Sequence, residues 1–182
     1  MSKNLKDIID LNKYPIHDLN SPKIKSIIEK CNSDLEQDSC STLPDFILPY
    51  SLKIMNNELE QQLNEVYMSK ESINAYLYAK DDPSLPNDHP KRTFMNRYNG
   101  YLNSDCFSEN SEMKFLYETE ELLNFVSACL GVSPIYRWAD PLACHAYNVM
   151  KPDGILPWHF DSCEFTLSLM IQKSEKGGIF EY

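Results

Sequence analysis

The chain has 182 residues, a formal net charge of −10 and an isoelectric point near 4.8. This acidic balance does not favour a nucleic-acid backbone or an anionic membrane as partner, because both attract basic surfaces. A hydrophobic content of 42% and an aromatic content of 12% argue against global disorder, and the length predicts a single domain with a sizeable core.

Residues 1–50 are polar and irregular, and we interpret them as a variable N-terminal segment. A short helix is predicted at 23–31. Ser21 and Pro22 precede it, and serine before a proline at the first helical position is a common helix start.

The range 51–140 is predicted to be a helical region. Apolar residues recur every three or four positions across 52–67, which predicts an amphipathic helix facing the core. A second helix is predicted from about 111 to 130, and Gly131 is a plausible residue to end it.

Between these helices, residues 81–90 hold three prolines and three aspartates, which predicts a loop. Lys91, Arg92 and Arg97 follow the loop. They form either a solvated basic patch, which we favour, or a clamp for a substrate carboxylate.

Residues 143–182 are predicted to form antiparallel strands, with a turn at 151–154 and a β-rich run at 165–171. Within this range stands Trp158-His159-Phe160-Asp161. Residues two apart on a strand project from the same face, so the side chains of His159 and Asp161 should converge. Two such ligands and a second histidine make the 2-His-1-carboxylate triad, which leaves positions on Fe(II) open for a co-substrate and O₂. Taken alone, a His-x-Asp tripeptide is a weak signal, since a surface strand with two polar residues also contains it.

The surrounding order is more specific. A strand, a turn, the Trp158-His159-Phe160-Asp161 motif, another strand and a Gly177-Gly178 turn follow one another. The range 141–182 thereby resembles the core of the Fe(II)- and 2-oxoglutarate-dependent dioxygenases, especially a branch acting on small molecules that include free amino acids. The resemblance implies an α+β fold in which N-terminal helices pack on a partial double-stranded β-helix (jelly-roll) core, with 141–182 as its front part.

The resemblance also implies a hydroxylase that uses Fe(II), 2-oxoglutarate and O₂ on a small-molecule substrate such as an amino acid or its derivative. His159 and Asp161 would be catalytic metal ligands. Tyr147 would either bond 2-oxoglutarate through its hydroxyl or pack as a buried strand residue. An intact Asp161 favours hydroxylation, because halogenating relatives carry a small residue at that position.

The family's third ligand is a later histidine, followed by a basic residue that pairs with 2-oxoglutarate. No histidine follows Asp161 in this chain, which ends at Tyr182 within an apolar run. The resemblance therefore predicts the front portion of a longer protein, with the third ligand outside these residues.

Three alternatives stay open: a non-catalytic metal-binding or interaction module, a different jelly-roll metalloprotein such as a cupin, and an inactive truncated fragment. Six cysteines without zinc-like spacing, and the lack of an apolar N-terminal signal or membrane-spanning run, predict a soluble cytoplasmic protein with reduced thiols. Neither the substrate nor the oligomeric state follows from the sequence.

Overall fold

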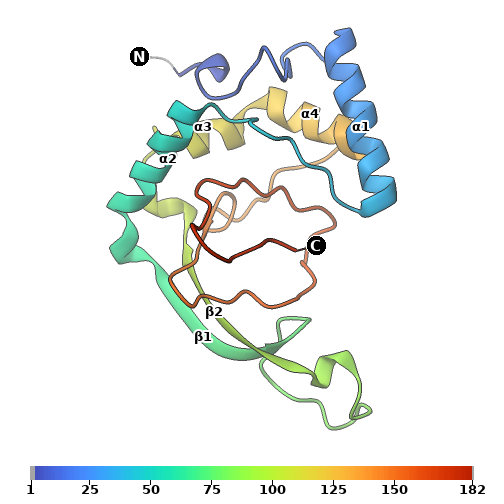
Figure 1. The fold of residues 1–182 in the computed structure, drawn as a ribbon, viewed down its shortest axis with the longest axis vertical. Coiled ribbons are helices and arrows are strands. Elements are labelled where there is room, and N and C mark those ends of the chain that lie inside the picture. The colour runs from blue at the N-terminus through green and yellow to red at the C-terminus, as the bar shows by residue number, and fades with distance from the viewer. Residues whose placement is uncertain (1–2, 182) are drawn as a thin grey trace.

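The computed structural model describes residues 3–181. Four α-helices lie along one side of the molecule, two long strands curve along the other, and the C-terminal segment runs between them (Figure 1). The helices are α1 (Pro22–Asp38), α2 (Pro49–Gln61), α3 (Glu112–Glu118) and α4 (Glu120–Leu130). The strands are β1 (Tyr67–Asn74), β2 (Phe94–Leu102) and β3 (Tyr147–Val149). Short 3₁₀ turns are η1 (Leu5–Asp7), η2 (Leu63–Glu65), η3 (Pro90–Arg92) and η4 (Ser104–Cys106).

The strands form one antiparallel sheet in the order β1-β2-β3. Tyr67 pairs with Tyr101 at one end of the β1–β2 ladder, and Asn74 pairs with Phe94 at the other. The mixed α+β class predicted from the sequence is therefore confirmed. A jelly-roll core is not seen in the described part of the chain, where the sheet has three strands.

The largest hydrophobic cluster lies among the helices and draws heavily on the N-terminal segment. Its buried residues there include Ile8, Ile9 and Ile16, and a bridge between Ile9 and Ile47 closes this segment on itself. The N-terminal segment was interpreted as variable because it is polar, but it supplies much of the core. A smaller cluster of Leu102, Phe107 and Tyr147 lies between the sheet and the helices.

Helix-end signals in the sequence are confirmed in two places. The hydroxyl of Ser21 accepts a hydrogen bond from the backbone of Ile24, and Pro22 is the first residue of α1, which extends to Asp38. At the end of α4, Gly131 has a φ of +65° and serves as the C-cap. Glycine adopts this left-handed conformation at little steric cost.

Two predicted helices have different bounds in the structure. The helix expected at 52–67 is α2 at Pro49–Gln61, and β1 already begins at Tyr67. The helix expected at 111–130 is broken at Thr119, whose extended backbone (φ −70°, ψ 125°) ends α3 and caps α4. The hydroxyl of Thr119 donates to the carbonyl of Phe115 at 2.8 Å. A side chain thus supplies a hydrogen bond to a backbone carbonyl near this break.

The prediction of antiparallel strands across 143–182 is wrong over most of that range. Only Tyr147–Val149 is a strand, and 165–171 follows an irregular path. A strand needs a partner edge for its backbone groups. One edge of β2 is paired with β1, and of the described residues after 142 only β3 and Ile155 pair with β2. Partly buried and exposed side chains still alternate over a short stretch. Leu169 and Ile171 pack on the helical cluster, while Met170 between them is exposed. Among residues 3–181, no helix combines the length and apolar character needed to cross a membrane.

Candidate functional site

The Trp158–Asp161 segment is held against the sheet at two points. Ile155 exchanges two backbone hydrogen bonds of 2.8 Å with Tyr98 of β2. Beyond it, the N–H of Phe160 donates to the carbonyl of Ala75, just past the end of β1, at 2.8 Å. The ring of Phe160 also lies 5.2 Å from that of Tyr76. The motif thus lies beside the loop that leaves β1.

The structure brings the two predicted ligands together. Nε2 of His159 lies 3.3 Å from Oδ1 of Asp161. Their side chains are 24% and 50% exposed, so the pair remains open to solvent. The predicted strand with both side chains on an inward face is therefore wrong for this segment, although the two side chains do meet.

The tautomer of His159 follows from its second contact. Nδ1 lies 2.7 Å from the carbonyl oxygen of Pro157, which can only accept, so Nδ1 carries a proton. In a neutral imidazole Nε2 then has a free electron pair, and it faces an oxygen of Asp161 that has electron pairs too. A cation bound by both atoms would remove this repulsion.

The other carboxylate oxygen of Asp161 is also fixed. The hydroxyl of Thr166 donates to Oδ2 at 2.6 Å, which leaves Oδ1 to face His159. Metal-binding histidines and carboxylates are commonly held by such outer contacts. Sequence reasoning did not identify Thr166 or the carbonyl of Pro157, because the irregular path of the chain, rather than a repeat spacing, places them.

The pair fits two of the positions around an octahedral ion. Two ligand atoms each about 2.1 Å from a metal, and about 90° apart, are separated by roughly 3.0 Å. The observed 3.3 Å between Nε2 and Oδ1 is close to that edge. Within residues 3–181, however, no three His, Cys, Asp or Glu side chains are grouped so that they could hold a metal ion. The described residues therefore offer two potential ligand atoms, one on His159 and one on Asp161.

Tyr147 lies apart from this pair. It is 6% exposed, and its ring stacks on Phe107 with 4.7 Å between centroids. Its hydroxyl is buried without a hydrogen-bond partner among the described residues. Burial, followed by the charges of Glu58 and Glu112, raises the pKa of Tyr147. The charges of two carboxylates on α2 and α3 thus act on the hydroxyl, and the contacts of His159 and Asp161 do not include it.

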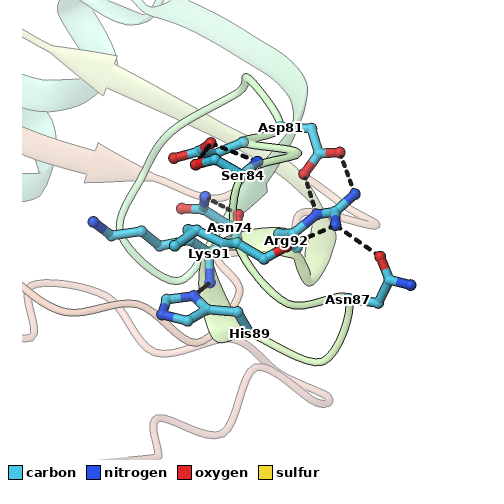
Figure 2. Close-up of polar contacts among 9 residues, drawn as sticks. Asn74, Asp81, Ser84, Asn87, His89, Lys91 and Arg92 are labelled. Atoms are coloured by element: carbon cyan, nitrogen blue, oxygen red, sulfur yellow. Dashed lines mark hydrogen bonds and ion pairs between the residues drawn. The ribbon is translucent and has the colours of Figure 1, made fainter.

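The basic residues after the 81–90 loop are engaged within the protein. Figure 2 shows the guanidinium of Arg92 paired with both oxygens of Asp81, each at 2.9 Å, and with Asn87 at 2.7 Å. Arg97 donates to Asn99 at 2.6 Å. These contacts give Arg92 and Arg97 structural roles and leave neither guanidinium free to clamp a substrate carboxylate.

Lys91 is the exception. Its ammonium lies 5.4 Å from the ring centroid of Tyr76, which contacts Phe160 of the motif. The ammonium of Lys91 is therefore linked to the motif through the rings of Tyr76 and Phe160. No known family model matches this chain, and no curated protein matches it either.

Proposed function

We propose that the chain is part of an Fe(II)- and 2-oxoglutarate-dependent dioxygenase that hydroxylates a small molecule, with an amino acid or its derivative as the candidate substrate class. The observation that carries the proposal is the pairing of His159 and Asp161. An imidazole nitrogen and a carboxylate oxygen face one another at 3.3 Å, and the other nitrogen of the ring is tied to a carbonyl. Metal-binding histidines commonly donate their other ring N–H to such a carbonyl, which supports the proposal.

Each residue of the site has a defined task in this proposal. His159 offers Nε2, because Pro157 holds the proton on Nδ1. Asp161 offers Oδ1, because Thr166 occupies Oδ2. When bound, iron together with 2-oxoglutarate and O₂ supplies the oxidising power to hydroxylate an unactivated C–H bond. The third protein ligand, a histidine, and the basic partner of 2-oxoglutarate are assigned to residues outside this chain.

The proposed fold is the front part of a jelly roll, built on the β1-β2-β3 sheet and the segment after it. The inward Leu169 and Ile171, separated by the outward Met170, support this, since they alternate as a strand would. A reducing cytoplasm suits both Fe(II) and the six free cysteines of the chain.

Metal binding tests the ligand pair directly. The purified 182-residue chain is titrated with Co(II), whose absorption reports its ligands, and with Fe(II) under anaerobic conditions. We expect weak binding that His159→Ala and Asp161→Ala each abolish, because each substitution removes one of two ligands. Glu164→Ala changes an exposed carboxylate in the same segment and should leave the affinity unchanged. Equal affinity in all variants would show that the pair is not the metal site.

Activity tests the enzyme class. The 182-residue chain alone should release little succinate from 2-oxoglutarate, whereas a chain extended to complete the barrel should couple that release to substrate hydroxylation. Substantial turnover by the short chain would contradict the assignment of the third ligand. In the extended chain, turnover that survives Asp161→Ala would refute the dioxygenase proposal.

A second candidate is a metal-binding module without catalysis, favoured by the partial ligand set among the described residues. It predicts Co(II) binding through His159 and Asp161 without succinate release from any extended chain. The two assays together therefore separate the candidates.

A further inference from the structure

A pocket of about 440 Å³ lies beside α3, away from the contacts that hold the His159–Asp161 pair. Its wall includes Cys144 and His145, from the segment before β3, and the side chains of Lys114 and Tyr117 on α3. Pockets of this size hold small organic molecules. None of the functions considered above uses this pocket.

Cys144 and His145 are paired at its wall. Sγ of Cys144 lies 3.1 Å from Nδ1 of His145, within hydrogen-bond reach for sulfur. When the thiol donates to Nδ1, the neutral imidazole carries its own proton on Nε2. That nitrogen is buried and has no hydrogen-bond partner in the described part of the chain. The imidazole is therefore placed to receive a proton from the thiol, and its other nitrogen has no competing protein acceptor.

The surroundings of His145 favour the neutral form of its imidazole. Burial and the nearby ammonium of Lys114 lower the pKa of His145, and the charges of Glu118 and Glu109 raise it by less. The ring of Tyr117 lies 5.6 Å from the imidazole and covers one side of it. An imidazole that is neutral near pH 7 can accept the proton of a thiol, which converts the sulfur into the nucleophilic thiolate.

The cations around the pocket are paired. Lys114 forms ion pairs with Glu109 and Glu118. Arg137, on the opposite wall, pairs with Glu120 at 2.7 Å and donates to the carbonyl of Tyr117 at 2.7 Å. The remaining charged side chain of the wall is Asp105, which precedes Cys106 in η4. Since no cation of the wall is left unpaired, the pocket has no free positive charge to attract an anionic ligand. It is suited instead to a ligand that reacts with the thiol.

We propose that Cys144 is a nucleophilic thiol, with His145 as its base, and that the pocket takes a disulfide of low molecular weight. Nδ1 of His145 accepts the proton of the thiol, and the thiolate attacks one sulfur of the disulfide. A new bond forms to Sγ of Cys144 as the disulfide bond breaks. The departing sulfur takes the proton back from the imidazolium and leaves as a thiol. The disulfide is the oxidant, so the exchange needs no other co-reactant.

The chain contains its own comparison thiols. Cys163 is exposed and lies outside the pocket, while Cys31 and Cys129 are buried in the helical core. Burial and Asp105 raise the pKa of Cys106, which disfavours its thiolate. If exposure alone set reactivity, Cys163 would react first. If the base sets reactivity, Cys144 reacts first.

The test uses dithiodipyridine, a small neutral disulfide whose leaving thiol absorbs light. The full chain is exposed to limiting reagent near pH 7, and each modified cysteine is identified by mass spectrometry of peptides. We expect Cys144 to be modified about tenfold faster than Cys163. This comparison is made within the unaltered protein, so it does not depend on the folding of any variant.

Two substitutions then isolate the base. His145→Asn places an amide near the position of Nδ1 but removes the base. The modification of Cys144 should become about tenfold slower, while the modification rate of Cys163 stays unchanged. His17→Asn, at an exposed histidine far along the chain, should change neither rate. Circular dichroism confirms that each variant is folded. Faster modification of Cys163 than Cys144 in the unaltered chain, or an unchanged rate at Cys144 in a folded His145→Asn variant, would overturn the proposal.

Discussion

Asn74, the last residue of β1, organises the turn that follows the strand, and replacing it tests how that turn is held. The residue is 1% exposed. Its side-chain oxygen accepts from the backbone N–H groups of Tyr76 at 2.9 Å and Tyr78 at 3.2 Å. Its side-chain nitrogen donates to the carbonyl of Lys91 at 2.6 Å, a contact that ties the turn to the far end of the loop (Figure 2).

Asn74→Ala removes all three of these hydrogen bonds. Each bond contributes about 1 kcal/mol net, and leaving a partly buried carbonyl or N–H without a partner adds to the loss. We therefore expect the free energy of unfolding to fall by about 3 kcal/mol, a large share of the roughly 5–15 kcal/mol typical of folded proteins. For a chain of this size, this corresponds to a Tm lower by roughly 6–12 °C.

Urea unfolding followed by circular dichroism measures the change. Asn74→Asp keeps the two accepted bonds but places a carboxylate oxygen against the Lys91 carbonyl, so it should also lower the free energy of unfolding. Asn96→Ala, at an exposed position of β2, is the matched control and should change stability by less than about 0.5 kcal/mol. A loss for Asn74→Ala no larger than that of the control would refute the reasoning.

Two further changes test other parts of the fold. Tyr147→Phe should leave the free energy of unfolding at pH 7 unchanged or higher, because the hydroxyl it removes is buried without a described partner. Because burial raises the pKa of Tyr147, the unfolded chain releases that proton first, and the unaltered protein should lose stability as the pH rises above about 10. Urea unfolding across this pH range should show a smaller loss in Tyr147→Phe, and an equal loss would contradict the assignment. Gly100→Ala should cost about 1–3 kcal/mol in the same assay, since its new carbon would lie 2.5 Å from Val66 and 3.2 Å from the backbone oxygen of Val149. A stability equal to that of the unaltered chain would show that β2 and β3 adjust freely at this point.

The helix ends could be predicted because they depend on local chemistry. Ser21 caps α1 through its own hydroxyl, and Gly131 ends α4 because its backbone conformation favours glycine. β1 and β2 were not predicted, because much of their surface is polar and partly exposed. In β1 the buried residues are Ser69, Ile73 and Asn74, which do not alternate with period two. Their pairing, which joins residues far apart in the sequence, stabilises them instead.

The candidate site could also be predicted only in part. The spacing of His159 and Asp161 brings their side chains together even without a regular strand. Thr166 could not be assigned, because its contact with Asp161 depends on how the chain turns between the two residues. Cys144 and His145 were not assigned to the candidate site from the sequence. Their importance appears only when the pocket beside α3 is known.

The hydrogen bond from Phe160 to Ala75 has a consequence for how this protein can vary. Surface loops usually accept insertions and substitutions readily. Here the loop after β1 supports the segment that carries His159 and Asp161, through the backbone of Ala75 and the ring of Tyr76. A change in loop length that moves Ala75 would therefore displace both proposed ligands without altering either of them. We expect sequence drift in this loop to be restricted near Ala75 and Tyr76 and freer toward its exposed tip.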